Sequence, residues 1–149
     1  MSDIMSIEEY RALTQKGSKK KGSPEHDEQV KVFEWAEIMS SKIPELKLLM
    51  AIPNGASYGG GGGRWNIAKR MKEEGVRSGV PDIFLPVVKE RGMHSPDVES
   101  GLWIEMKVGK NKPSEQQMWW LKELELQGYR AMVCYSSTEA IAEIEDYLN

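Results

Sequence analysis

Two acids and a lysine stand inside or beside short apolar runs of this sequence, where a charge is costly to bury. Asp82 opens the run 83–88, and Glu105 and Lys107 lie within the run 102–108. Both runs are rich in β-branched and aromatic residues and are bounded by Gly or Pro, which predicts two short strands. Because side chains alternate along a strand, Glu105 and Lys107 point to the same face. An acid and a base in such a setting need to be paired or bound to a metal.

If the two strands are neighbours, the carboxylates of Asp82 and Glu105 meet at one place. Two carboxylates are hard oxygen ligands that suit a cation such as Mg²⁺ or Mn²⁺, and the amine of Lys107 would lie beside it. The alternative is an ordinary ion pair on the solvated face of a strand. Pro81 fixes the backbone just before Asp82, and Glu105 and Lys107 lie in the middle of their run. The metal site is therefore the preferred interpretation.

These residues belong to a longer pattern, with IPNG at 52–55, GVRSGVPD at 75–82, EMK at 105–107 and SEQQ at 114–117. Pro81-Asp82 together with Glu105-Met106-Lys107 resembles the PD-(D/E)xK nuclease motif. The order and spacing of the whole pattern resemble the VRR-NUC branch of that superfamily, in particular its short stand-alone members. The resemblance covers roughly residues 25–148.

The resemblance implies a restriction-endonuclease-like α/β fold with an αβββαβ core, in which a mixed sheet is flanked by helices. Periodicity along the chain predicts the individual elements. Helices are expected at about 24–41, 65–74, 114–127 and 138–148, and strands at about 46–52, 83–88, 102–108 and 129–135. The helix at 65–74 is then an insertion after the first strand, and the other elements contain the αβββαβ order.

The activity that the resemblance implies is divalent-metal-dependent, structure-specific hydrolysis of DNA, as in Holliday-junction resolvases. Asp82 and Glu105 would bind Mg²⁺ or Mn²⁺, with the backbone carbonyl of Met106 as a further oxygen ligand. Lys107 would position or deprotonate the attacking water, or neutralise the negative charge that develops at the phosphate. Two alternatives stay open: a non-catalytic DNA-binding module on the same fold, and a flap or nicking nuclease.

Two further site residues follow from the resemblance. In related nucleases an acid from the first helix completes the metal shell, and both Glu25 and Glu28 qualify here. The pattern Glu-x-x-x-Gln, which ends at Gln29, favours Glu25. A glutamine at the place of Gln117 belongs to the active site of the family. The same residue also completes a capping box with Ser114, so a catalytic role and a helix-capping role both stay open.

Basic residues gather near the predicted site although the formal net charge is −3. Residues 61–112 hold ten Lys or Arg against seven acids, whereas residues 113–149 hold two against seven. This asymmetry fits phosphate contacts on one face of the protein, although chance also produces such asymmetry on a solvated surface. The expected DNA contacts are Arg64, which follows the five glycines at 59–63, and Lys72, Arg77, Lys110 and Lys112.

With 149 residues, the chain has room for one core. We expect a flexible basic leader at 1–24 and a nuclease domain at 25–149, because the Gly, Ser and Lys of the leader bury too little surface to order it. Apolar runs of membrane-spanning length and a signal-peptide pattern are both missing. A location in the cytoplasm of a bacterial or phage-infected host cell is expected.

Aromatic content predicts a homodimer. The chain holds five tryptophans, and Trp119 and Trp120 are adjacent. Two adjacent side chains on one helix cannot both face the same core, so one of them is expected in a subunit contact. A symmetric dimer would supply two active sites for the two strands of a four-way junction. The alternative is a monomer with an ordinary core.

Overall fold

The computed structural model describes residues 22–53, 64–91 and 97–149 of the chain. Most of the expected leader and all of the five-glycine segment lie outside the described residues. The division into a leader at 1–24 and a domain at 25–149 therefore stays a prediction. Arg64 begins a helix, but its side chain also lies outside the described part.

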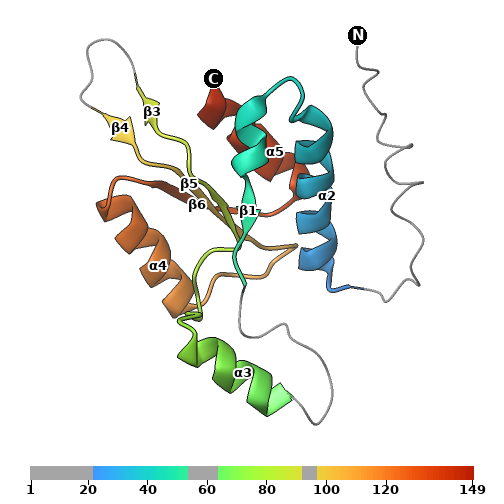
Figure 1. The fold of residues 1–149 in the computed structure, drawn as a ribbon, viewed down its shortest axis with the longest axis vertical. Helices are drawn as coiled ribbons and strands as arrows, with labels where there is room; N and C mark the ends of the chain where they lie inside the picture. The colour runs from blue at the N-terminus through green and yellow to red at the C-terminus, as the bar shows by residue number, and fades with distance from the viewer. Residues whose placement is uncertain (1–21, 54–63, 92–96) are drawn as a thin grey trace.

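A four-stranded mixed sheet forms the centre of the protein (Figure 1). Its strands follow the order β1-β2-β5-β6, with β1 at Met50–Ala51, β2 at Ile83–Leu85, β5 at Leu102–Met106 and β6 at Arg130–Cys134. The first two pairings are antiparallel, and β5 pairs with β6 in parallel. Parallel neighbours need a crossover, and helix α4, at Glu115–Leu126, provides it.

One face of the sheet carries the core. Ile83 of β2 lies opposite Ile104 of β5, and both are almost fully buried. Helices α2 (Pro24–Met39) and α5 (Ser137–Leu148) cover this face and pack against each other (Figure 1). Because side chains alternate along β5, Trp103 and Glu105 point to the opposite face, the side on which α4 lies.

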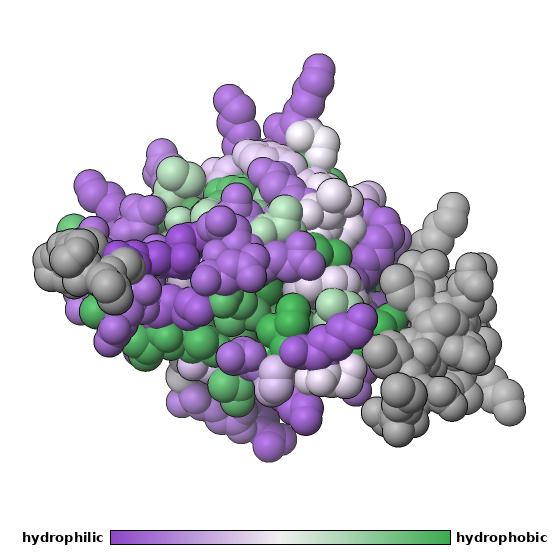
Figure 2. Space-filling model, turned by 90° about the horizontal axis from the view of Figure 1, so that it is seen from above, coloured by the Kyte–Doolittle hydropathy of each residue, from purple (hydrophilic) through white to green (hydrophobic). Residues whose placement is uncertain are grey.

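The remaining elements lie at the periphery. Helix α3, at Arg64–Glu73, stands below α4, and the short strands β3 (Lys89–Glu90) and β4 (Val98–Glu99) form a separate two-stranded sheet (Figure 1). Seen from above, the surface is mainly hydrophilic, with hydrophobic side chains emerging in patches (Figure 2). None of the described helices is long and apolar enough to cross a membrane.

The predicted fold class is confirmed, but three local predictions differ from the structure. The expected strand at 46–52 is a 3₁₀ helix, η1 at Pro44–Leu48, followed by the two residues of β1. Pro44 favours that start because it fixes φ near a helical value. Strand β2 ends at Leu85, since Pro86 has no N–H to donate. Strands β3 and β4 lie between the expected strands at 83–88 and 102–108, where no strand was predicted.

Candidate active site

Two strands of the sheet hold Asp82 in place. The residue directly precedes β2, and its Oδ2 accepts a hydrogen bond of 2.8 Å from the backbone N–H of Met106. Its backbone carbonyl accepts another, also of 2.8 Å, from the N–H of Ile52. Pro81, which is fully buried, fixes the chain just before it. Asp82 is thereby attached to the strand that carries Glu105, as the sequence predicted for neighbouring strands.

Glu105 and Lys107 form a buried ion pair. Lys107 Nζ donates to Glu105 Oε1 at 2.8 Å, and the two side chains are 10% and 1% exposed. The backbone N–H of Lys107 donates to the carbonyl of Cys134, which continues the pairing of β5 with β6 by one residue. The two side chains therefore share one face, as their spacing predicts.

Gln117 acts as a helix cap and as a neighbour of the buried acid at the same time. Its Oε1 accepts a hydrogen bond of 2.8 Å from the N–H of Ser114, whose Oγ accepts one of 3.2 Å from the N–H of Gln117. The Nε2 of the same amide donates to Glu105 Oε1 at 2.5 Å. The cap and the contact with Glu105 use opposite ends of the amide, so the capping role does not exclude a role at the site.

The structure places Glu25 at the site and Glu28 away from it. Glu25 Oε1 lies 4.0 Å from Lys107 Nζ and accepts a hydrogen bond of 3.3 Å from Asn111 Nδ2. Glu28 instead pairs with Lys31 and accepts hydrogen bonds from the N–H and Oγ of Ser137, at the start of α5.

These partners fix the protonation of Glu28. Its bonds with Lys31 and then with Ser137 lower the pKa of the Glu28 carboxyl to about 2. Glu28 therefore fastens helix α2 to helix α5, while Glu25, one turn earlier, faces the buried ion pair.

Sequence reasoning missed Asn111. Its side chain connects the turn before α4 to Glu25 on α2. In the sequence, its only signal is that it is an amide residue between Lys110 and Lys112, two lysines that were predicted to contact DNA.

Negative charge is in excess at this site. Burial, and then the charge of Asp82, raise the pKa of the Glu105 carboxyl to about 7, although Lys107 opposes the shift. For Lys107, burial lowers the pKa of the amine, but the hydrogen bond and charge of Glu105, with Glu25 and Asp82, raise it overall. The second oxygen of Glu105, Oε2, is buried without a hydrogen-bond partner in the described structure. A cation near this oxygen would satisfy it and lower the pKa of Glu105.

The carboxylates of Asp82 and Glu105 fit a hard divalent cation. Mg²⁺ needs only one or two carboxylates from the protein, since water and substrate phosphate supply its other oxygens. Among the described residues, no three His, Cys, Asp or Glu side chains form a ready-made metal cluster. The carbonyl of Met106 and the carboxylate of Glu25 stay predictions as additional ligands.

The expected DNA-contacting residues lie on two sides of this centre. Lys110 and Lys112 are exposed in the turn that also carries Asn111. Lys72 and Arg77 line a cavity between α3 and α4. Arg64 begins α3, with its side chain outside the described part.

Comparisons with known proteins agree with the fold. The model of the VRR-NUC domain matches residues 62–138, a segment that contains Asp82, Glu105, Lys107 and Gln117 but not Glu25. A solved structure described as a VRR_NUC domain protein is similar with a TM-score of 0.62 and 25% sequence identity. The similarity covers 85% of this chain and 89% of that one. No curated protein sequence matches the chain.

Proposed function

This chain belongs to the VRR-NUC domain family, a family of nucleases, and we propose that it is a divalent-metal-dependent endonuclease that hydrolyses phosphodiester bonds in DNA. The observation that carries this proposal is the buried carboxylate of Glu105. It lies next to Asp82, bonds to Lys107 and keeps one oxygen without a partner among the described residues. A buried charge of this kind is costly, and a cation-dependent reaction gives it a use.

The residues divide the chemistry between them. When bound to the carboxylates of Asp82 and Glu105, a divalent cation supplies an acidified water and stabilises negative charge on the phosphate. Lys107 stays protonated near neutral pH because its pKa is raised. Its ammonium group therefore positions the attacking water or neutralises charge at the phosphate, and it is a poor general base.

The neighbouring polar side chains support this centre. Gln117 donates to Glu105 Oε1, so it orients the carboxylate and leaves Oε2, which has no partner among the described residues, to face a cation. Glu25, held by Asn111, supplies a further acid from helix α2. Orientation of this kind matters because small displacements of reacting groups slow a reaction strongly.

The exposed basic residues on either side of the centre would bind the DNA backbone. Each phosphate contact adds to the dependence of affinity on salt concentration. Neutralising Lys72, Arg77, Lys110 and Lys112 together should weaken binding to all sequences alike and flatten that dependence. Lys122→Gln is a suitable control, because this lysine is exposed on α4 and is not among the proposed contacts. An unchanged salt dependence in the quadruple variant would place the DNA elsewhere.

The substrate we propose is branched DNA, cut by a homodimer in the manner of a Holliday-junction resolvase. Resolving a four-way junction takes cuts on two strands, and a two-fold dimer supplies two identical sites. Light scattering tests the dimer, since a mass near the 16.9 kDa of one chain would reject it. A plasmid-borne cruciform tests paired cutting: linear product without accumulated nicked circle supports it, and nicked circle alone favours a flap or nicking activity.

A cleavage assay tests the proposed activity. Linear, flap, bubble and four-way-junction DNA are incubated with Mg²⁺ or Mn²⁺ and, in parallel, with a chelator. Cleavage that requires the cation and is lost in a folded Glu105→Ala variant is expected. Tight DNA binding without cleavage under any of these conditions would instead identify a non-catalytic DNA-binding module.

A further inference from the structure

A cavity of about 820 Å³ opens between helices α3 and α4, on the side of the molecule that α3 occupies in Figure 1. The proposed hydrolysis does not use it. Its walls combine aromatic, aliphatic and basic side chains, among them Met71, Lys72, Arg77, Ser78, Trp119 and Trp120. None of the described residues that line it is acidic.

The two tryptophans have different roles in this wall. Trp120 is fixed, because its Nε1 donates a hydrogen bond of 3.1 Å to the carbonyl of Ser78. Trp119 is 54% exposed, and its ring meets that of Trp120 edge-on with a centroid distance of 5.3 Å. One ring therefore supports the other, and the supported ring offers a large aromatic surface beside the cavity.

The cations of the cavity have no acidic partners among the residues that the structure describes. On α3, Lys69 and Arg70 each pair with a glutamate four residues further on. Lys72 and Arg77 line the cavity instead, and neither is in an ion pair with a described residue. Two cations without an ion-pair partner in the described part of the chain, beside an exposed aromatic ring, suit a ligand that carries both a phosphate and a π-face.

Residues that line the cavity are close in sequence to residues of the proposed active site and are hydrogen-bonded to their neighbours. Ser78 lies four residues before Asp82, and its Oγ donates to Gln116 Oε1 at 3.2 Å. Gln116 directly precedes Gln117, which donates to Glu105. Gly79, which directly follows Ser78, has a φ of +82°, and a Cβ there would lie 2.8 Å from Cγ of Gln116. The close approach of this segment to α4 therefore requires glycine.

We propose that this cavity binds an unstacked nucleobase of the DNA strand next to the bond that is cut, with Trp119 as the stacking surface and Lys72 and Arg77 on the adjoining phosphates. The inference rests on the proposed nuclease function and specifies its substrate. A base inside a duplex cannot reach such a pocket, so the DNA must offer an unpaired or extruded base near the cut. A second copy of this chain is the less suitable occupant, because it would bury two cations for which the described residues supply no ion-pair partner.

Binding by metal-free protein tests the proposal without relying on cleavage. Affinity is measured in chelator by fluorescence anisotropy, for one labelled single-stranded oligonucleotide and for its duplex. Trp119→Ala should weaken single-strand binding about 5- to 150-fold, the effect expected from losing one base–aromatic stack, and should change duplex binding much less. Trp119→Phe should restore most of the affinity, because it keeps an aromatic face.

Met118→Ala is the matched control. Met118 is the neighbouring residue on α4 and is 52% exposed, but it does not line the cavity. Its variant should bind both DNA forms like the unmodified protein. Equal loss of single-strand and duplex binding in Trp119→Ala, or no loss, would overturn the proposal. So would a lower mass in light scattering for Trp119→Ala, because Trp119 would then lie between two copies of the chain.

The cavity and the nuclease function can fail separately. If the unmodified protein cuts DNA but Trp119→Ala binds single strands normally, the cavity assignment is wrong and the nuclease stands. If Trp119→Ala loses single-strand binding but the unmodified protein cuts no DNA with Mg²⁺ or Mn²⁺, the nuclease assignment is wrong and the cavity stands.

Discussion

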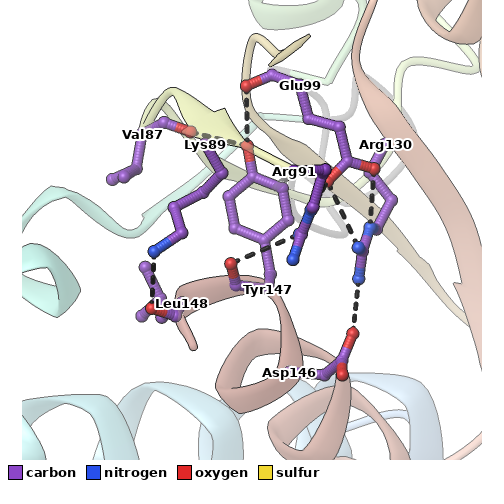
Figure 3. A network of polar contacts seen from close by, with 8 residues as sticks. All are labelled: Val87, Lys89, Arg91, Glu99, Arg130, Asp146, Tyr147 and Leu148. Atoms are coloured by element: carbon purple, nitrogen blue, oxygen red, sulfur yellow. Dashed lines mark hydrogen bonds and ion pairs between the residues drawn. The ribbon is translucent and has the colours of Figure 1, made fainter. Parts of the chain in front are cut away.

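Two glutamates of this protein lie in charged clusters of opposite character. Glu99, on β4, receives hydrogen bonds from Arg91 and from Arg130, and Arg130 also bonds to Asp146 at 2.8 Å (Figure 3). Glu105, on β5, has one basic partner in the described structure, Lys107, and shares it with other acids. The first cluster joins the small β3–β4 sheet to α5, whereas the second lies at the proposed active site.

The difference shows in the protonation of the two carboxyls. Burial raises the pKa of Glu99, but the bonds from Arg130 and Arg91 outweigh burial and lower it overall. Burial and Asp82 raise the pKa of Glu105 to about 7, because one lysine does not outweigh them. Basic residues of the chain thus balance the negative charge of the cluster around Glu99. The cluster around Glu105 keeps an excess of negative charge, which a cation would balance.

The largest expected difference between the clusters is in catalysis. Asp82→Ala or Glu105→Ala should reduce Mg²⁺-dependent cleavage by at least about 10⁴-fold, because the cation loses an oxygen ligand and several kcal/mol of charge stabilisation. Gel-based cleavage of branched DNA measures the loss, and circular dichroism checks the fold. Cutting by a folded double variant would refute the metal site.

Removing the basic partner of Glu105 should have the next largest effect. Lys107→Ala should lower the cleavage rate about 10²–10³-fold, since losing one group that stabilises developing negative charge typically costs that much. Single-turnover rates at saturating protein separate this loss from weaker DNA binding. A variant that loses only affinity would show that Lys107 is a DNA contact and takes no part in the chemical step.

The two clusters should respond to pH with opposite signs in the metal-free protein. The folded-state pKa of Glu105 is raised from 4.5 to about 7. The contribution of Glu105 to the free energy of unfolding is therefore fully present below pH 4.5 and is lost as the pH rises through about 7. The loss reaches about 3 kcal/mol. Glu99 has a lowered pKa, so its contribution is present above its ordinary pKa and is lost as the pH falls.

Urea unfolding in chelator from pH 4.5 to pH 8 measures the effect of Glu105. The Glu105→Gln variant should lack this part of the pH dependence, because its side chain does not ionise. Identical pH slopes in the variant and the unmodified protein would mean that Glu105 is charged throughout this range.

The smallest expected effect comes from breaking the cluster around Glu99. Glu99→Gln should lower the free energy of unfolding by about 1–2 kcal/mol, because two arginines lose their charged acceptor. The loss is limited by partial exposure, since the Glu99 side chain is 24% exposed. Cleavage should be unchanged at a temperature where the variant is folded. Glu145→Gln, an exposed acid on α5, is the control for stability.

The grouping of the candidate active-site residues was predictable because strand alternation is a local rule. Glu105 and Lys107 occur two residues apart in an apolar run, and the structure places them together on one face. Neighbouring strands then bring Asp82 to them. The helices also follow from local periodicity and caps, with Ser23 and Ser114 as the N-cap residues of α2 and α4.

Contacts between distant parts of the chain were not predictable in the same way. The segment 89–97 has no periodicity, yet β3 and β4 form around it with the help of Lys89, which donates to the carbonyl of Leu148 59 residues away. The choice between Glu25 and Glu28 likewise depends on Ser137, more than a hundred residues later in the chain. A local pattern gives no information about such partners.

The two hydrogen bonds of the Gln117 side chain fix the distance of each position on helix α4 from Glu105. The amide attaches the first turn of the helix to Glu105, and from there each residue advances 1.5 Å and turns 100°. Trp119, two residues on, is therefore held at a fixed rise and angle from the carboxylate of Glu105, independent of any loop. If an unpaired base stacks on Trp119, the number of nucleotides between that base and the broken bond is constant. The enzyme would then choose its cutting position by counting from the first unpaired base rather than by reading a sequence.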